Sequence, residues 1–386
     1  MHQLIEEFKA VCAERPFDLL EQKSEGKKIC EYTGRYVPEE IIYAAGMNAY
    51  PMWRGGEPEP PDAVLDESVR FLNPYARTQY GLLKLSLDPV AEEADVYAFS
   101  LTDCHTYRIC ELIEHAGYPV CKVGVPSVWL DDNDLDYYAN KVDHLKLRLE
   151  EASGVKIKDS DIETAIRLYN KIRSLLRQIN EARKLPNPPI KGSEFVTLNH
   201  CAMSCDPEVA VEYLEKAIDI CRSAQADAPE KKRPRIAIFG HVIAQGDYIA
   251  IKAFEEAGAD IVCEILDDGR FEFGVDVEEC SSDPTAAIVR NRYRDVLPNN
   301  NMQPSWELRR EKLMNAVEDY NVDGVVFYDT LYDEIYNMEY SCMADFLSEK
   351  GLPLVRITTS YEYTREAMGP LNTRVETFVE TLQGRK

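Results

Sequence analysis

Cys104 and His105 directly follow a short apolar run, residues 95–101. Such a run predicts a buried strand, and Asp103 after it predicts the cap of a helix. The positive end of a helix lowers the pKa of a thiol placed there, and a thiolate suits a metal or a metal cluster. Cys104 is therefore a candidate ligand, and a buried thiol without a role is the alternative interpretation.

Two further apolar runs end beside reactive side chains. Residues 235–240 lead to His241, and residues 322–327 lead to Tyr332 and Asp333. Ligands in open parallel sheets bind beyond the carboxyl ends of the strands, so we expect these loops to face a cleft between the two halves of the chain. His241 could there bind a carbonyl or a phosphate oxygen. A hydrogen-bonded, structural histidine is the alternative.

Glu40 lies in the segment 37–46, which carries helix signals at both ends. Pro38 and the neighbouring acids are typical of a first helical turn, and Gly46 is typical of a helix end. A carboxylate in the first turn is stabilised by the helix dipole. Helix capping alone would therefore account for Glu40.

Several well-known catalytic and binding motifs do not occur in the sequence. The patterns GxxxxGK[ST], GxGxxG, HExxH and GxSxG are all missing. The first of these marks P-loop ATPases and the second marks dinucleotide sites. We therefore expect no nucleotide cofactor on this chain.

Predicted strands alternate with helices in both halves of the sequence, on either side of a helical middle. The predicted strands are residues 28–32, 95–101, 118–123, 235–240, 261–265, 322–327 and 353–358. This alternation predicts an α/β fold with parallel sheets that helices cover on both faces. We place an N-terminal α/β domain at 1–155, a helical connecting segment at 156–230 and a C-terminal α/β domain at 231–386.

The predicted helices carry start and stop signals of varying strength. They are residues 4–12, 37–46, 104–116, 160–183, 207–224, 246–257, 306–320, 339–350 and 372–382. Ser160 and Glu163 are spaced as a capping box, and apolar residues recur behind them at helical intervals. A loop is expected at 55–62, and a linker is expected at 225–234.

The chain is strongly acidic, with 68 acidic against 44 basic residues and a net charge of −24. Such a protein repels phosphate backbones, which excludes nucleic acid as a partner, and it must bind any anionic ligand against its overall field. We interpret two basic clusters, within 231–235 and 309–312, as solvated surface.

The location of the protein follows from what its apolar stretches and cysteines indicate. No run of 18 apolar residues and no secretory signal occurs, so we expect a cytoplasmic protein without a membrane span. The 11 cysteines then predict reduced thiols rather than disulfides. Cys201 and Cys205 would share one helical face, which is weak evidence for a metal.

Several of these segments together resemble the family of 2-hydroxyacyl-CoA dehydratases and benzoyl-CoA reductases. Residues 37–46 are similar to its N-terminal motif, and residues 98–104 resemble its motif of a strand followed by a cysteine. Later similar segments, in the same order, are 255–262, 322–327, 351–355 and 372–378. The resemblance therefore covers nearly the whole chain.

The resemblance implies two Rossmann-like domains and a pair of related subunits. It also implies a [4Fe-4S] cluster held by three cysteines from three loops, and an ATP-dependent activator protein that supplies one electron. The substrate would be an acyl-CoA thioester whose carbonyl becomes a ketyl radical, on the way to dehydration or to ring reduction. The cofactor would do the difficult step while the protein positions it and excludes water.

Only one of the three family cysteines is present in this sequence. Cys104 matches the second cysteine, Asn73 stands at the first, and Tyr332-Asp333 replaces the Cys-Asp pair of the third. Iron in a cluster prefers thiolate ligands. We therefore expect a cluster-free subunit beside a paralogous subunit that carries the cluster. Substitution by a nearby thiol such as Cys110, or an offset of the compared loops by some residues, are the alternatives.

This interpretation assigns a role to each candidate residue. The expected substrate-binding residues are Asn73, Arg77, His241, Tyr332 and Asp333. Glu40 and His105 would be catalytic, and Cys104 would be the metal ligand. A non-catalytic structural or CoA-binding partner of a cluster-bearing paralogue is the second hypothesis, and an unrelated small-molecule-binding α/β protein is the third.

Overall fold

Two four-stranded parallel sheets form the centre of the computed structural model, which describes residues 1–223, 233–267 and 273–385. The first sheet has the order β2-β1-β3-β4. Its strands are β1 (Ile29–Thr33), β2 (Asn48–Pro51), β3 (Val96–Leu101) and β4 (Val120–Gly124). The second has the order β6-β5-β7-β8. Its strands are β5 (Arg235–Gly240), β6 (Asp260–Leu266), β7 (Gly324–Thr330) and β8 (Leu354–Thr359).

The two sheets share one strand order, although the sequence shows no clear repeat. In each sheet the strand order reverses between two neighbouring strands, which are β1 and β3 in the first sheet and β5 and β7 in the second. Doubly wound sheets open a crevice for ligands at such a point. The strands β3 and β5 are buried along their whole length because helices cover both faces. The predicted α/β fold with two Rossmann-like units is confirmed.

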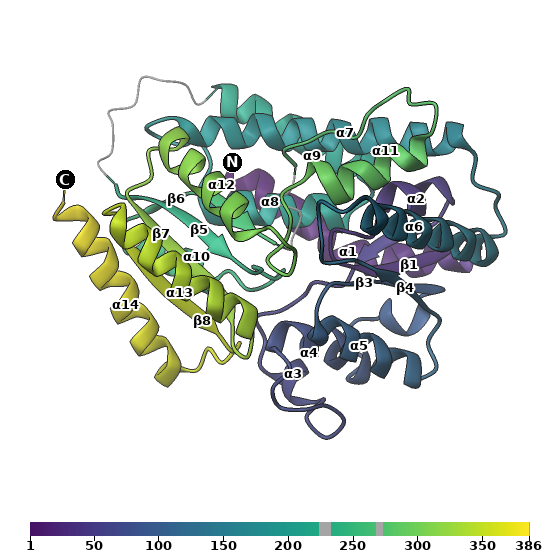
Figure 1. Cartoon of the computed structure of the whole chain (residues 1–386), viewed down its shortest axis with the longest axis horizontal. Helices are drawn as coiled ribbons and strands as arrows, with labels where there is room; N and C mark the ends of the chain where they lie inside the picture. The colour runs from purple at the N-terminus through teal and green to yellow at the C-terminus, as the bar shows by residue number, and fades with distance from the viewer. Residues whose placement is uncertain (224–232, 268–272, 386) are drawn as a thin grey trace.

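Helices surround both sheets (Figure 1). Those of the first half are α1 (His2–Ser24), α2 (Glu39–Ala44), α3 (Glu59–Asp62), α4 (Pro74–Lys84), α5 (Cys104–His115) and α6 (Asp132–Ser153). The middle contains α7 (Asp159–Glu181), α8 (Gly192–Ser204) and α9 (Pro207–Ser223). The second half contains α10 (Ile249–Glu256), α11 (Pro284–Arg290), α12 (Trp306–Asp319), α13 (Glu334–Glu349) and α14 (Arg365–Gln383). Among the described residues, no helix has the length and apolar character that spanning a membrane requires.

Some local predictions were wrong, and each error has a physical reason. The helix α7 begins before the predicted capping box, and the Asp161 carboxylate accepts a hydrogen bond from the Lys158 amide (3.2 Å). The first helix continues past Cys12 to Ser24 because Leu19 packs into the interior. The expected loop 55–62 contains the short helix α3. The expected linker 225–234 lies largely outside the described residues.

The helix α7 belongs to both halves of the molecule. Ile162 and Ile166 near its start pack into the core around the first sheet, whereas Ile172 and Leu176 further along pack into the core around the second. Figure 1 shows α7 running along both sheets. The helix therefore holds the two sheets side by side.

Each half also contributes a segment to the core of the other. Phe8 of α1 packs with Ile236 and other side chains of the second sheet. In return, Ile288 of α11 and Tyr293 after it pack with residues of the first sheet. This packing crosses the domain limits predicted at 155 and 230, so that three-part division stays a prediction.

The prediction that the two basic clusters are solvated surface is wrong for two of their arginines. Arg309 is completely buried and pairs with Asp267 and Glu339. Arg235 is also buried, and its guanidinium group donates hydrogen bonds to three backbone carbonyl oxygens. Charges so far from water must be paired or hydrogen-bonded, and both arginines are. Residues 231 and 232 of the first cluster lie outside the described residues.

Candidate functional site

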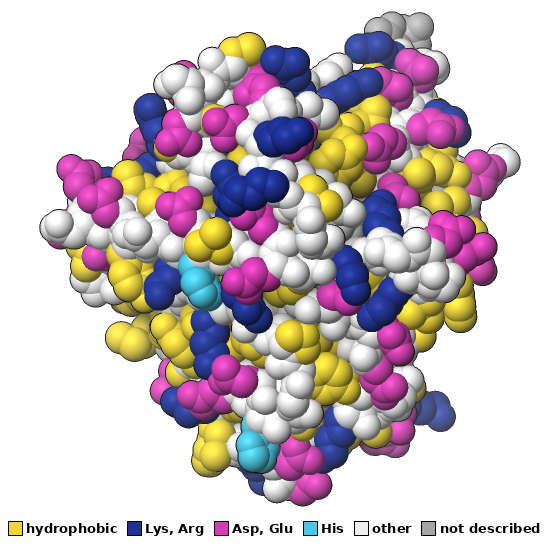
Figure 2. Space-filling model, turned by 90° about the vertical axis from the view of Figure 1, so that its right-hand side faces the viewer, with side chains coloured by type: hydrophobic (Ala, Val, Ile, Leu, Met, Phe, Trp, Pro, Cys, Tyr) yellow, Lys and Arg dark blue, Asp and Glu magenta, His cyan; other side chains and the backbone are white. Residues whose placement is uncertain are grey.

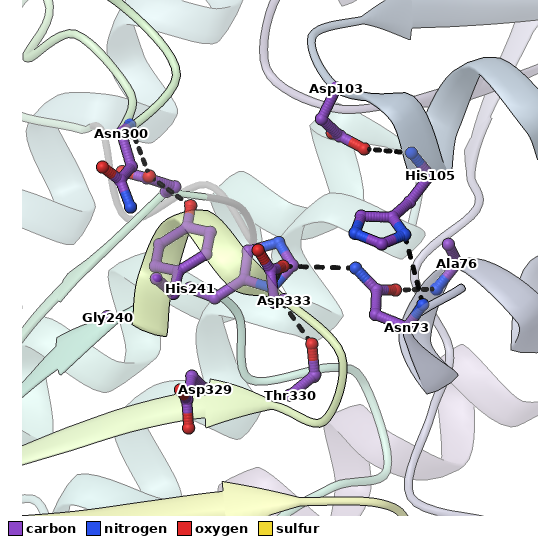
Figure 3. A network of polar contacts seen from close by, with 12 residues as sticks. Asn73, Ala76, Asp103, His105, Gly240, His241, Asn300, Asp329, Thr330 and Asp333 are labelled. Carbon is purple, nitrogen blue, oxygen red and sulfur yellow. Dashed lines mark hydrogen bonds and ion pairs between the residues drawn. The ribbon is translucent and has the colours of Figure 1, made fainter. Parts of the chain in front are cut away.

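Four segments meet at the carboxyl ends of the strands β3, β5 and β7 (Figure 3). They are the start of α4, the turn from β3 into α5, the residue after β5 and the turn from β7 into α13. They enclose a cavity of about 490 Å³, which is within the size range of small-molecule sites. The predicted residues that line it are Cys104, His105, His241, Tyr332 and Asp333. Asn73 lies beside His105 and His241 at an adjoining void of about 40 Å³.

Asn73 links the two halves of the site. Its Oδ1 accepts a hydrogen bond from the Ala76 amide (2.7 Å), which caps α4, and its Nδ2 donates to Asp333 Oδ2 (3.2 Å). Its own backbone amide donates to His105 Nδ1 (3.3 Å). The side chain is nearly inaccessible to solvent, at 2%. Asn73 is therefore a fixed bridge between α4, α5 and the β7–α13 turn.

His105 is a neutral imidazole in this arrangement. Its Nδ1 accepts a hydrogen bond from the Asn73 amide, so the proton lies on Nε2. Burial lowers the pKa of His105, which also favours the neutral ring. Asp103 fixes the backbone at the start of α5 by accepting hydrogen bonds from the amides of His105 (2.8 Å) and Thr106 (2.9 Å). The Nε2–H group can thus donate a hydrogen bond to a ligand.

His241 and Asp333 form a close pair on the opposite side of the site. His241 Nδ1 lies 3.2 Å from Asp333 Oδ2. Burial lowers the pKa of His241 to about 4, and burial together with the charge of Asp103 raises the pKa of Asp333 well above its usual range. Both pKa shifts favour the uncharged form of the residue concerned. The contact is therefore a hydrogen bond between a carboxylic acid and a neutral imidazole rather than an ion pair.

A buried polar network holds the ring of His241 in place. The ring of Tyr336 stacks on His241, with centroids 4.5 Å apart, and its hydroxyl donates to Asp267. Asp267 also accepts from the backbone amide of Asn300 (2.8 Å) and pairs with Arg309. Because every member is buried and bonded, the imidazole is held in one orientation.

Tyr332 is held in an unusual backbone conformation at the cavity wall. Its φ is +67°, in the left-handed region that residues other than glycine seldom adopt. Its ring contacts Phe71 edge to face, with centroids 5.6 Å apart. Strained backbone of this kind is concentrated at functional sites.

Cys104 faces the cavity but differs from the expectation for its thiol. It is the first residue of α5, as predicted, and it is exposed. Partial burial and the nearby Asp103 and Asp333 carboxyl groups raise its pKa. The expected lowering by the helix dipole is therefore outweighed, and the thiol form is favoured.

The structure does not bring Glu40 and Arg77 to the cavity. Glu40 is fully buried and pairs with Arg173 and Arg292. Burial opposes its ionisation, but the two arginines outweigh burial and keep its pKa below the usual range. Arg77 donates to the carbonyl oxygens of Leu72 (3.1 Å) and Pro61 (2.8 Å). Both side chains hold neighbouring segments together, and a catalytic or binding role for them stays a prediction.

Comparison with known proteins places the chain in a family. A sequence profile described as 2-hydroxyglutaryl-CoA dehydratase, D-component, matches residues 35–382. The chain belongs to this family. It is 26% identical to the beta subunit of (R)-2-hydroxyglutaryl-CoA dehydratase from Acidaminococcus fermentans, over 98% of this chain and 99% of that protein.

Two further relatives show how wide this D-component family is. A benzoyl-CoA reductase subunit from Thauera aromatica is 22% identical over 92% of this chain and 91% of its own length. The (R)-phenyllactyl-CoA dehydratase beta subunit from Clostridium sporogenes is also 22% identical, over 92% of both chains. All three relatives are named as subunits of enzymes that act on acyl-CoA thioesters.

The residues at the site do not fit the [4Fe-4S] cluster that the family resemblance implies. Cys104 is the one thiol at the three matching positions, and the Asn73 side chain is fully engaged with Ala76 and Asp333. Cys110 is buried in the core against α4 and is not among the cavity residues. Within 1–223, 233–267 and 273–385, no group of three or more His, Cys, Asp or Glu side chains is arranged to hold a metal ion.

Sequence reasoning missed three residues of the site. Asp267 follows β6 directly, so the same rule of strand ends would have found it. Tyr336 lies one turn after Asp333, and nothing in its sequence context marks it. Arg309 was assigned to the surface because its partners, Asp267 and Glu339, are 42 and 30 residues away.

Proposed function

We propose that this chain is the cluster-free subunit of a heterodimeric, 2-hydroxyacyl-CoA dehydratase or benzoyl-CoA reductase type of enzyme. The observation that carries the proposal is the set of side chains at residues 73, 104 and 332, which lie around one site and include a single sulfur. Membership in the D-component family supports the substrate class, an acyl-CoA thioester. A paralogous subunit with all three cysteines would carry the [4Fe-4S] cluster, and an ATP-dependent activator would serve that subunit.

The described residues are suited to binding a thioester in the cavity. Neutral His105 can donate a hydrogen bond from Nε2 to a carbonyl oxygen, and the uncharged His241–Asp333 pair adds no negative charge that would repel it. Buried donors of this kind are stronger than donors in water. The one-electron chemistry belongs, in this proposal, to the partner. A cytoplasmic location is part of the same proposal, because 11 cysteines kept as thiols require a reducing compartment.

Anaerobic iron and sulfide analysis tests the absence of a cluster. The chain is purified without oxygen, alone and together with its co-purifying subunit, and both samples are analysed for iron. We expect iron in the complex and none in the isolated chain. About four irons on the isolated chain would refute the proposal, since that is the content of one [4Fe-4S] cluster.

A non-catalytic partner that stabilises the complex is the second candidate. Both candidates require a contact with another subunit, which would cover the apolar side chains of Val69 and Phe71, 62% and 68% exposed at the cavity mouth. The variant His105→Gln in the assembled complex separates the two candidates. A catalytic contribution predicts a loss of about 100-fold or more in turnover, whereas a stabilising subunit predicts none. His115→Gln, at an exposed position of α5, is the matched control.

A further inference from the structure

Two cysteines that are distant in sequence are in contact where α1 packs against the end of α8. Cys12 lies on α1, and Cys205 ends α8. Their sulfur atoms are 2.9 Å apart although the residues are separated by 193 positions. Cys12 Sγ also lies 3.6 Å from the carbonyl oxygen of Cys201. The spacing of Cys201 and Cys205 is visible in the sequence, and the structure adds Cys12, whose sulfur contacts that of Cys205.

Neighbouring contacts fix the backbone on both sides of this thiol pair. One turn along α1, Arg15 binds the Asp206 carboxylate through two hydrogen bonds of 2.8 and 2.6 Å. The Phe8 ring stacks on Tyr213 of α9, with centroids 4.3 Å apart. A disulfide has a sulfur–sulfur distance of about 2.0 Å, so the two sulfurs need to approach by only about 0.9 Å.

The pair can be reached by small molecules. Cys12 is half-buried and lines a cavity of about 440 Å³ between α1 and the loops around residues 55 and 246. Cys205 is buried and lines a separate cavity of about 650 Å³. Cavities of this size accept molecules such as a low-molecular-weight disulfide. Cys12 is therefore the thiol that such a reagent meets first.

A metal site is a poorer account of the same side chains. None of the described His, Cys, Asp and Glu residues form a group of three or more suited to a metal ion. The neighbouring thiols and burial raise the pKa of Cys12, so both thiols of the reduced pair are mostly protonated and react slowly. The geometry suits a sulfur–sulfur bond better.

We infer that Cys12 and Cys205 are a site of reversible thiol–disulfide exchange that links α1 to the end of α8. Cys12 loses its proton to solvent, and its thiolate attacks a low-molecular-weight disulfide, forms a mixed disulfide and releases one thiolate of the reagent. Cys205 loses its proton to solvent and attacks the Cys12 sulfur, which releases the second thiolate. Two protein thiols are thereby oxidised, and one reagent disulfide is reduced to two thiols. This inference is independent of the proposed function.

Treatment of the reduced, folded chain with glutathione disulfide tests the inference. We expect the wild type to yield, after proteolysis without reduction, one linked pair of peptides that contain Cys12 and Cys205, whereas the exposed thiols Cys104 and Cys280 should form only mixed disulfides with glutathione. The melting temperature should rise by several degrees, because the crosslink closes a long loop of the unfolded chain. A reducing agent should restore both thiols and the original melting temperature.

Matched variants make the result specific. Cys12→Ser and Cys205→Ser should yield no linked pair of peptides, and in Cys205→Ser the reaction should stop at a mixed disulfide on Cys12. Cys221→Ser, at a buried position of α9, should still yield the linked pair. Cys201→Ser should also still form the crosslink. A folded wild type that yields no link between Cys12 and Cys205, a link from Cys12 to Cys201, or a bound zinc ion that blocks the oxidation would each overturn the inference.

Discussion

Burial rather than charge pairing determines the protonation states of the side chains at the candidate site. His241 and Asp333 are both less than a tenth exposed, and burial shifts their pKa values in opposite directions, so both become uncharged. His105 follows the same rule. A site of this kind offers hydrogen-bond donors of fixed direction without a net charge, which suits a neutral carbonyl group.

The lowered pKa of His241 predicts a pH dependence of stability. Its folded pKa of about 4 is below the ordinary value of about 6.5, so the unfolded chain gains a proton first as the pH falls. Its contribution to stability is complete above about pH 6.5 and is lost as the pH falls towards 4. We expect His241→Gln to show a smaller loss of unfolding free energy across this range, measured by urea denaturation. An equal pH dependence in His241→Gln and the wild type would contradict this prediction, and exposed His115→Gln is the control.

Restoring two thiols tests whether the side chains alone exclude a cluster. We expect the double variant Asn73→Cys, Tyr332→Cys to bind iron and sulfide on anaerobic reconstitution, because Cys104 then becomes one of three thiols around the site. Loss of the Asn73 cap should cost about 1 kcal/mol of stability. The readout is iron content and the visible absorbance of the cluster. The matched double serine variant should bind none, and uptake by the wild type would contradict the prediction.

Sequence reasoning found residues of the site where a local rule applied and missed those that depend on distant partners. Cys104, His105, His241 and Asp333 follow predicted strands, and the topology of parallel sheets brings strand ends together. Glu40 also carried local helix signals. Its role in the structure depends on Arg173, which is 133 residues away, and no spacing in the sequence reveals that contact.

At the scale of helices, capping residues position the site. Asp103 caps α5 and Asn73 caps α4, so both helices start at the cavity. We expect Asp103→Ala to lower the free energy of unfolding by about 0.5–2 kcal/mol, because two backbone amides lose their acceptor. Chemical denaturation measures the change. Asp143→Ala, at an exposed position inside α6, should change stability by less than about 0.5 kcal/mol.

Arg309 joins α12 to the second sheet and to α13. We expect Arg309→Met to destabilise the protein by about 3–5 kcal/mol, because Asp267 and Glu339 would remain buried without their cation. The neighbouring variant Arg310→Met should have a much smaller effect, since Arg310 makes one long hydrogen bond to the Cys342 carbonyl oxygen (3.5 Å). Similar losses in both variants, measured by thermal and urea unfolding, would show that the buried network is not responsible.

Seven of the eight strands in the described residues were predicted, whereas β2 and five helices were not: α3, α4, α6, α8 and α11. Strands buried on both faces read as continuous apolar runs, as β3 and β5 do. The helix α8 is buried along all its length, so it shows no amphipathic period that would have predicted it. The helix α6 was missed because most of its residues are polar and only four are buried: Tyr138, Val142, Leu145 and Leu149.

At the scale of the whole molecule, the surface combines both charges despite the net charge of −24. Figure 2 shows acidic and basic side chains interspersed, with apolar groups between them, on the face that it draws. At the cavity mouth two apolar side chains are largely exposed, since Val69 and Phe71 are 62% and 68% exposed. This apolar rim is where we expect the proposed partner subunit to bind.

Substitution in this rim tests the expected contact. We expect Phe71→Asp to abolish co-purification with the partner subunit, because a carboxylate would have to be buried at the interface. Its own fold should be destabilised by no more than about 1.5 kcal/mol, from the lost ring contact with Tyr332. Leu147→Asp, at a 54% exposed position of α6, is the control and should leave the complex intact. Retention of the partner by Phe71→Asp would place the interface elsewhere.

The exchange of segments between the two halves has a consequence for biosynthesis. The first sheet needs Ile288 and Tyr293 to complete its core, so the amino-terminal half cannot finish folding until some three-quarters of the polypeptide has left the ribosome. Phe8, synthesised at the very beginning, waits until α9 has been made, because its ring stacks on Tyr213. Nascent chains released early would thus expose apolar surface in both lobes, and such products would be natural clients of chaperones and proteases.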